Sequence, residues 1–296
     1  MTRLRFVSVT ALALAVVVGA CAGSHKSAKT RFDPHGDAGV STSKIAQILN
    51  AAQAVTASTS QAALVAEGQK LFESTSRGRQ GEACATCHIN GGGVNMAVGI
   101  INHPTKPGDF TGPRTPIPLW GVANTAPYTW AGTVATLETQ VTNTILNFFV
   151  VGKTQPTATT AKQMAAIVAY LKTLKPPTTA FDNGTMSAEA LQGEALFNGK
   201  ATCVHCHSGP FFTDNRIHVI DVPPLPGETD PGNPSLPGGF NTASLRDVRN
   251  SAPYMHNGSL PTLSAVVDFY DNNKVAGVPP LSGPDKAALV AYLASL

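Results

Sequence analysis

Apolar residues recur at spacings of three and four in several short segments of this chain, which is the pattern of amphipathic helices. The segments are residues 61–73, 161–174, 187–197 and 284–296, and Ser187 stands at the N-cap position of the third. No stretch of six residues alternates clearly between apolar and polar positions, so we expect little β-sheet. The pattern predicts an all-α protein with long loops between short helices.

The amino terminus has the pattern of an export signal. Arg3 and Arg5 precede an apolar run at residues 7–18, which is too short to cross about 30 Å of hydrocarbon as a helix. The run leads into the letters VGAC at residues 18–21, which resemble a bacterial lipobox. We therefore expect residues 1–21 to be a signal peptide and Cys21 to carry a lipid anchor on the periplasmic side of the envelope. Ordinary cleavage after position 20 or 22 is the alternative.

Residues 22–60 are rich in Ser, Thr, Ala and Gly and contain few large apolar side chains. This composition is typical of a flexible tether. One short helix is expected within it, at residues 45–54.

The rest of the chain contains an internal repeat. Four short blocks recur in the same order at nearly one offset: 68–72 with 193–197, 84–88 with 203–207, 126–132 with 252–258, and 167–171 with 289–293. Pro176 and Pro177 lie between the two sets and cannot continue a helix. The repeat predicts two tandem domains, residues 61–177 and 178–296. The chemistry of the second repeated block, which follows, predicts that both are cytochrome c-like.

That second block reads Cys-x-x-Cys-His in both copies, with Cys84, Cys87 and His88 in the first. This is the attachment signature of c-type haem, because two thiols at this spacing reach the two vinyl groups of a porphyrin and the histidine then faces the iron. The second copy supplies Cys203, Cys206 and His207. The motif predicts one covalent haem c in each domain.

Other uses of these cysteines are a redox disulfide, a zinc site or structural disulfides. A redox disulfide leaves the adjacent histidines unexplained, and the two pairs lie much further apart than zinc ligands usually do. Export would permit structural disulfides. The chain has 5 cysteines; four in two haem sites leave Cys21 for the lipid.

Composition narrows the partners. The chain has 21 Lys+Arg against 18 Asp+Glu, and no basic run stands out, so no nucleic-acid partner is expected. An apolar fraction of 43% is too high for a disordered chain. The 27 glycines and 22 prolines fit long loops over the haems.

The sixth ligand of each iron decides between electron transfer and peroxide chemistry. Candidates in the loops of the first copy are Met96 and His103. Those of the second copy are His218, Met255, His256 and Tyr270.

Further motifs carry a family resemblance. The second copy has SGPFFTDN at 208–215, TASLRDV at 242–248 and APYMHNGSL at 252–260, and the first has GPRTP at 112–116 followed by Trp130 and Gln140. With the two haem signatures, these residues resemble the bacterial dihaem cytochrome c peroxidase/MauG family over residues 61–296.

The resemblance implies a role for each matching residue. The first haem would react with peroxide and the second would accept electrons. Trp130 would lie between the haems, Gln140 in the peroxide pocket, and Arg246 at a haem propionate. Tyr270 matches the distal ligand of the second haem, which is tyrosine in MauG-type proteins and methionine in the peroxidases; Met255 is the rival ligand.

The chain also departs from the family pattern. Val150 stands where the family has an acid–base glutamate, which puts efficient peroxidase turnover in doubt. His103 falls near a removable distal ligand of the first haem. The family calcium site maps onto Thr115, Ser251 and Pro253, and a threonine hydroxyl is a poorer calcium ligand than the asparagine it replaces.

Together these features predict an exported dihaem oxidoreductase. It would reduce hydrogen peroxide with electrons from a small redox protein, a cytochrome c or a cupredoxin, or would oxidise a side chain of a partner protein. A dihaem electron-transfer cytochrome without peroxidase turnover is the alternative. Membrane contact is expected through the lipid anchor only, and the resemblance makes a homodimer one expected assembly.

Overall fold

Helices dominate the part of the chain that the computed structural model describes, which is residues 42–74, 83–91, 93, 101–102, 113–146, 158–228 and 230–296. In these residues no helix combines the length and the apolar character that a membrane crossing needs. Cys21, Met96, His103 and Val150 lie outside the described residues, as does the expected signal peptide. The expectations for them stay predictions.

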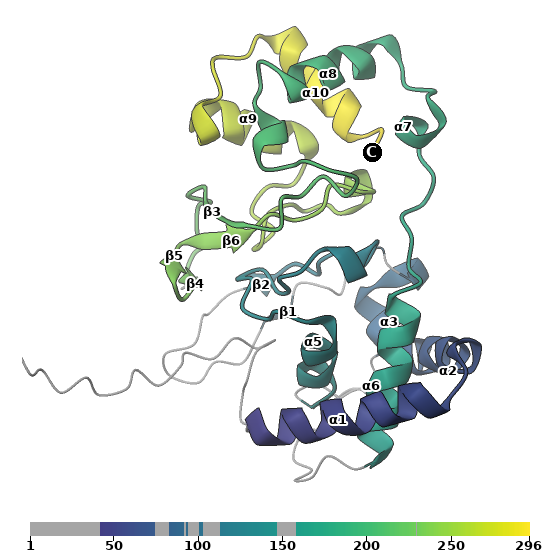
Figure 1. Cartoon of the computed structure of the whole chain (residues 1–296). Helices are drawn as coiled ribbons and strands as arrows, with labels where there is room; N and C mark the ends of the chain where they lie inside the picture. The colour runs from purple at the N-terminus through teal and green to yellow at the C-terminus, as the bar shows by residue number, and fades with distance from the viewer. Residues whose placement is uncertain are drawn as a thin grey trace, which may run out of the picture. The chain divides into compact units, whose positions relative to one another are not determined.

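The N-terminal half, residues 42–177, is built around one apolar core. Its helices are α1 (Thr42–Ser58), α2 (Gln61–Glu73), α3 (Cys84–Cys87), α5 (Leu137–Thr144) and α6 (Ala158–Leu171). Helix α6 contacts α2, α1 and α5 (Figure 1). Leu64 and Phe72 of α2 and Met164 of α6 are almost fully buried in this core.

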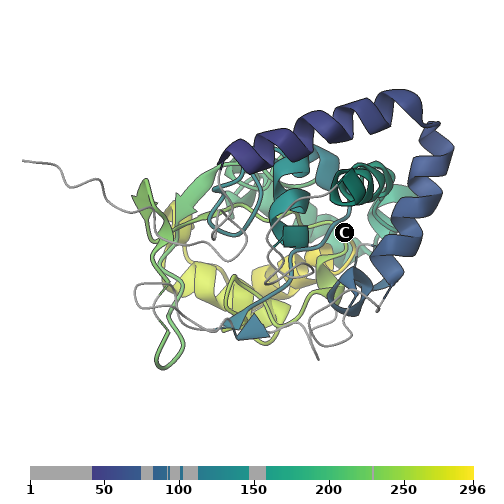
Figure 2. The ribbon, with the colours of Figure 1, turned by 90° about the horizontal axis from the view of Figure 1, so that it is seen from below.

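The prediction of a flexible tether through residue 60 is corrected by the structure, because residues 42–58 form helix α1. Its Ile45, Ile48 and Ala52 are buried, and Ile48 and Ala52 belong to the same core as α6. These side chains recur at spacings of three and four, so one face of α1 is apolar despite the many small polar residues around it. The short helix expected at 45–54 is therefore a 17-residue helix packed on the N-terminal half. Figure 2 shows α1 followed by α2, which turns sharply away from it.

The C-terminal half, residues 178–296, has a second apolar core. Its helices are α7 (Ala180–Asn183), α8 (Ala188–Asn198), α9 (Leu263–Asn272) and α10 (Gly283–Leu293). Helix α8 packs on α10, and Phe197 meets Tyr292 with ring centroids 5.2 Å apart. The Ser187 hydroxyl accepts a hydrogen bond from the Ala190 N–H at 3.1 Å, which confirms Ser187 as the N-cap of α8.

The repeated glycines mark the helix crossing in each half. A Cβ atom on Gly68 of α2 would overlap the Ala166 carbonyl oxygen of α6 and lie 2.7 Å from Tyr170 Cβ. A Cβ atom on Gly193 of α8 would likewise overlap the Ala288 carbonyl oxygen of α10. Each pair of helices therefore approaches to a distance that leaves room for glycine alone.

The third repeated block forms the same turn twice. Ala126-Pro127 and Ala252-Pro253 are both cis, and the next turn residues, Thr129 and Met255, both have positive φ, at 73° and 70°. Each turn closes with an isolated bridge, Tyr128 to Val134 and Tyr254 to Leu260.

A fifth repeated block emerges only in three dimensions. Residues 119–122 and 245–248 both lead through a left-handed residue, Gly121 at φ 66° and Asp247 at φ 59°, into a short 3-10 helix, η3 (Val122–Asn124) and η6 (Val248–Asn250). The Gly121 N–H donates to the Leu174 carbonyl and the Asp247 N–H to the Leu296 carbonyl. In each half, this segment is thus hydrogen-bonded to a leucine carbonyl at or near the last residue of that half.

The described residues also form six short antiparallel strands. They pair as β1 (Ile101–Asn102) with β2 (Pro113–Arg114), β3 (Ile217–Val219) with β6 (Gly239–Asn241), and β4 (Gly232–Asn233) with β5 (Leu236–Pro237). The low sheet content agrees with the sequence pattern, although strands β3 to β6 make the long loop of the C-terminal half more regular than expected.

Candidate functional site

Each haem-attachment motif opens onto a cavity of its own. The C-terminal cavity has a volume of about 340 Å³ and is lined by Cys203, Cys206 and His207. The N-terminal cavity has a volume of about 210 Å³ and is lined by Cys84, Cys87 and His88. The structure thus brings each predicted attachment set together on one cavity wall.

His207 has the hydrogen bonding of an iron ligand. Its Nδ1 lies 3.0 Å from the Phe212 carbonyl oxygen. A carbonyl only accepts, so Nδ1 carries the proton and the Nε2 lone pair is free for a metal. Burial lowers the pKa of His207, which keeps the ring neutral, as ligation requires.

None of the four described cysteines, Cys84, Cys87, Cys203 and Cys206, forms a disulfide in this structure. Burial raises the pKa of Cys84 to about 12 and that of Cys203 to about 11. Protonated thiols beside an apolar cavity suit covalent attachment to a porphyrin edge better than they suit thiolate ligation of zinc.

Gln140 of α5 lines the N-terminal cavity and has a side-chain oxygen that accepts no hydrogen bond. Its Nε2 donates to the Thr144 hydroxyl at 3.3 Å, while its buried Oε1 has no hydrogen-bond partner. A buried acceptor without a donor is costly unless a ligand supplies one. The residue therefore fits a pocket that receives a small molecule with an O–H group.

Trp130 lies on a wall that the two cavities share. Both cavities are lined by Thr115, Pro116, Pro118 and Trp130 from the N-terminal half and by Asn241, Thr242, Ala243 and Ser244 from the C-terminal half. The Trp130 indole N–H donates to the Thr115 carbonyl at 2.8 Å, and its own carbonyl accepts from the Asn241 N–H at 2.7 Å. The indole is thus held on the wall that the two cavities share, and its place between two haems stays a prediction.

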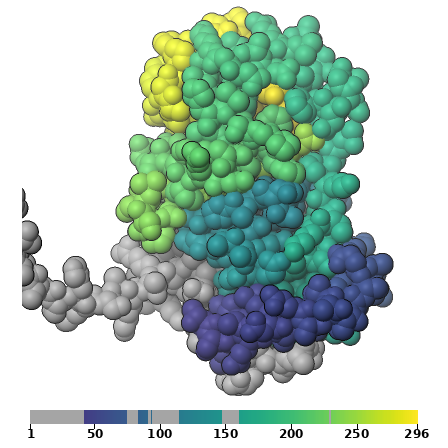
Figure 3. All heavy atoms as spheres, in the orientation of Figure 1, coloured from purple at the N-terminus to yellow at the C-terminus, as the bar shows by residue number. Residues whose placement is uncertain are grey.

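Further hydrogen bonds join the two halves around this wall. The Asn241 side chain donates to the Pro127 carbonyl at 2.7 Å, and the Asn233 side chain donates to the Ala131 carbonyl at 2.6 Å. In Figure 3 the atoms of residues 113–146 meet those of the C-terminal half along one boundary.

All four candidates for the sixth ligand of the second haem line the C-terminal cavity: His218, Met255, His256 and Tyr270. Tyr270 enters it from α9, and Met255 enters from the turn after Pro253. Burial, and then the nearby thiols of Cys203 and Cys206, raise the pKa of the Tyr270 phenol. A bound cation would oppose both effects.

We expect Tyr270→Phe to change the spectrum of the second haem alone. If the tyrosine oxygen binds that iron, its removal changes coordination while the Cys84 site keeps its ligands. Optical and EPR spectra of the oxidised holoprotein check this, with Met255→Leu as the matched control, for which no change is expected. A change in Met255→Leu and none in Tyr270→Phe would reverse the assignment.

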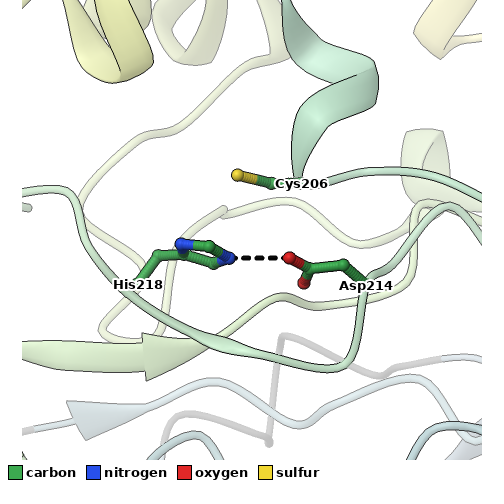
Figure 4. A group of neighbouring side chains, drawn as sticks. All are labelled: Cys206, Asp214 and His218. Carbon is green, nitrogen blue, oxygen red and sulfur yellow. Dashed lines mark hydrogen bonds and ion pairs between the residues drawn. The ribbon is translucent and has the colours of Figure 1, made fainter.

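The two candidate histidines of this cavity, His218 and His256, contact other side chains of the protein. His218 Nε2 lies 2.8 Å from an Asp214 oxygen, beside Cys206 (Figure 4). His256 stacks on the Phe240 ring at a centroid distance of 3.8 Å, and burial, followed by the charge of Arg114, lowers its pKa to about 3.

A buried charged cluster adjoins Trp130. Arg114 pairs with Asp230, and His256 Nε2 lies 3.7 Å from both Glu228 and Asp230. The His256 ring meets the edge of Trp130 at a centroid distance of 6.5 Å. All four charged or titratable side chains are at least nine-tenths buried, with exposures of 8%, 4%, 5% and 1% for Arg114, Asp230, His256 and Glu228. Sequence reasoning missed this cluster.

The predicted calcium residues offer weaker support. Thr115, Ser251 and Pro253 all line the C-terminal cavity. The Thr115 hydroxyl, however, donates to the Met255 carbonyl at 2.8 Å. The set provides no carboxylate, which calcium sites usually contain. Calcium at this position stays a prediction.

Arg246 contacts a carboxylate of the protein in this structure, and its role at a haem propionate stays a prediction. It is absent from the lining of either cavity, and its Nη2 donates to both oxygens of Asp182 at 2.7 and 2.6 Å. Its guanidinium also lies over the Phe181 ring. A carboxylate at the start of the C-terminal half thus holds the group that was expected at a haem propionate.

Comparison with known proteins bears on the whole chain. The model of the di-haem cytochrome c peroxidase family matches residues 62–187, and that of the RoxA-like, cytochrome c-like family matches residues 239–274. Among curated proteins, the cytochrome-c peroxidase IdrP1 of Denitromonas iodatirespirans is 30% identical over 284 residues, covering 70% of this chain and 72% of that protein. The methylamine utilization protein MauG of Methylorubrum extorquens is 31% identical over 253 residues, covering 70% and 68%.

Solved structures agree on the fold. A MauG-like protein associated with microbial copper homeostasis superposes with a TM-score of 0.64 at 22% identity, over 79% of this chain and 88% of that one. The diheme peroxidase BthA of Burkholderia thailandensis superposes with a TM-score of 0.61 at 20% identity, over 79% and 86%. With relatives at this identity and coverage, and with two cavities lined by the Cys-x-x-Cys-His residues, the chain belongs to the di-haem cytochrome c peroxidase family and is a haem-dependent oxidoreductase.

Proposed function

We propose that this protein is an exported, lipid-anchored dihaem oxidoreductase, built from two tandem cytochrome c-like domains, that uses hydrogen peroxide. Peroxide would react in the N-terminal cavity, and electrons would arrive through the C-terminal one. The observation that carries this proposal is Trp130, which lines both cavities and so offers a route between them.

The residues divide the work between the two cavities. When bound, the haem iron supplies the centre at which peroxide is reduced. His88 and His207 would be the axial ligands on the attachment side. Gln140 Oε1 would accept a hydrogen bond from peroxide and orient it, and the Thr115 carbonyl holds Trp130 in place.

Acid–base assistance is weak in the N-terminal cavity. None of the described residues that line it is an aspartate or a glutamate. Glu138, the nearest acid to Gln140 in sequence, pairs with Lys172 at 2.7 Å instead. A site without a carboxylate favours slow peroxide turnover, since proton transfer by a side chain typically contributes about 10²-fold or more to the rate.

Slow peroxide turnover argues against rapid peroxide removal and is compatible with a MauG-like role. The substrate would then be an oxidisable side chain of a partner protein, and a cytochrome c or a cupredoxin would be the electron donor in the peroxidase role. Tyr270 at the distal position of the second haem supports the same choice.

The test separates communication between the haems from peroxide reactivity. We expect Trp130→Phe to slow the response of the second haem to peroxide by about tenfold or more, because an easily oxidised group is removed from the shared wall. Stopped-flow spectra of the holoprotein with peroxide measure this. Tyr128→Phe is the matched control, since Tyr128 lines the N-terminal cavity alone.

An unchanged rate in Trp130→Phe would contradict the route through this residue. If peroxide leaves both spectra unchanged and both irons are six-coordinate and low-spin in the reduced wild type, the protein is a dihaem electron carrier and the proposed enzyme function is wrong.

A further inference from the structure

The second tryptophan of the chain also lies where the two halves meet. Trp120 is half-buried in the block that repeats as residues 245–248, and it occupies the place that Arg246 has in the other copy. Its indole Nε1 donates to Asp247 Oδ2 of the C-terminal half at 3.3 Å. Trp120 therefore forms a hydrogen bond between the two halves, while Trp130 lines the cavities of both halves.

The two indoles differ in what accepts their N–H hydrogen bond. Trp130 donates to the neutral carbonyl of Thr115, whereas Trp120 donates to the carboxylate of Asp247. Loss of an electron makes an indole positively charged and its N–H strongly acidic. A buried negative acceptor stabilises that charge and can take the proton, which a neutral amide carbonyl does not do.

Asp247 is held rigidly for this role. Its side chain belongs to a residue that is only 7% exposed, and Asn250 Nδ2 donates to its Oδ1 at 2.6 Å. The Asp247 N–H is fixed to the Leu296 carbonyl at 3.1 Å. Because Asn250 binds Oδ1, the second carboxylate oxygen, Oδ2, is left to accept the hydrogen bond from the Trp120 indole.

The chain connects Trp120 directly to the N-terminal cavity. Leu119 lines that cavity and Pro118 lines both cavities. Gly121 follows in a left-handed conformation, with the Phe211 ring filling the space that a side chain would need. The Trp120 ring also approaches Gly93, because a Cβ built there would lie 3.8 Å from Trp120 Cζ2.

We propose that Trp120 and Asp247 form a second redox-active pair beside Trp130. The proposal rests on peroxide reacting at the N-terminal haem. Reduction of one hydrogen peroxide to two waters takes two electrons and two protons. Trp120 would supply one of these electrons, and its Nε1 proton would move to Asp247 Oδ2. The redox-protein donor would supply the other electron, and solvent would supply both protons consumed with the peroxide. A second electron from the donor then restores the indole, and the proton returns from Asp247.

The first experiment is freeze-quench EPR of the peroxide-treated holoprotein with deuterated tryptophan. We expect the yield of the tryptophan radical to fall about tenfold or more in Trp120→Phe, where any remainder belongs to Trp130, and to persist in Trp130→Phe. It should also fall about tenfold or more in Asp247→Asn, which keeps the shape and removes the charge. An undiminished radical yield in Trp120→Phe, or no radical while both haems respond to peroxide, overturns the proposal.

A second experiment does not depend on peroxide. The holoprotein is illuminated with a ruthenium tris-bipyridyl photo-oxidant and persulfate, and mass spectrometry measures oxygenation at the two tryptophans. We expect Asp247→Asn to lower oxygenation at Trp120 about tenfold and to leave Trp130 unchanged. An equal yield at Trp120 in both proteins contradicts the pairing. A Trp120 effect here with no peroxide reaction would reject the proposed function and keep the redox pair.

Discussion

Arg114→Leu should destabilise the folded protein by about 3–5 kcal/mol, the usual cost of leaving a buried charge without its partner. Arg114 is the cation of the buried cluster that contains Asp230, Glu228 and His256. Burial, followed by the charge of Arg114, lowers the pKa of His256 to about 3. Burial is the larger cause and remains in the variant, so we do not expect the imidazole to replace the guanidinium near pH 7. Two carboxylates would then share a dry site without a counter-charge.

Urea unfolding of the holoprotein, followed by circular dichroism, measures this effect. Lys286→Met is the matched control: it removes a cation from an ion pair with Asp271 at 2.7 Å, but that lysine side chain is 25% exposed. Pairs near the surface contribute about 1 kcal/mol or less. Equal losses in the two variants would show that burial of the Arg114 cluster has no special cost.

The loss in Arg114→Leu should also depend on pH. Burial already raises the pKa of Asp230 above its ordinary value of 3.8, and loss of the guanidinium raises it further. A raised pKa in the folded state means that the folded protein binds the proton more tightly than the unfolded chain. The penalty is therefore smaller at acid pH and grows as pH rises through the folded pKa. The difference from wild type should narrow when unfolding is repeated at pH 5.

Gly193→Ala should cost about 3 kcal/mol, at the upper end of the usual cost of overpacking a core. The new methyl would overlap the Ala288 carbonyl of α10, and backbone cannot move aside as a flexible side chain can. Since α8 and α10 form the core of the C-terminal half, the strain would fall on the haem-bearing part of that half.

Gly283→Ala is the control for this substitution, because a Cβ at Gly283 meets nothing within 4 Å. It should be neutral or slightly stabilising, since alanine restricts the unfolded chain more than glycine does. Thermal unfolding of the holoproteins compares them, and Gly68→Ala should repeat the loss in the N-terminal half. A Gly193→Ala protein as stable as wild type would contradict the close helix crossing.

Local chemistry explains why the sequence alone indicates the two haem-attachment sets. Covalent attachment demands Cys84, Cys87 and His88 at one fixed spacing, so a five-residue window contains the whole signal. Trp130 and Gln140 were found because the resemblance covers their surroundings, and the structure places both on cavity walls.

Long-range contacts explain what sequence did not predict. The pairing of Arg114 with Asp230 joins segments from different halves, and no local pattern indicates it. The block at 119–122 shares only two of its four letters with 245–248, so the repeat around Trp120 was visible only from matching backbone geometry. Helix α1 was missed because its apolar face is narrow and its other residues are small.

The wall shared by the two cavities also has an evolutionary consequence. A domain with its own core can in principle fold alone. Here, however, Pro116 and Pro118 of one half, and Asn241 to Ser244 of the other, line both cavities. Deleting either half would remove part of the wall of the other half's cavity, so we expect the two halves to be retained or lost as a unit.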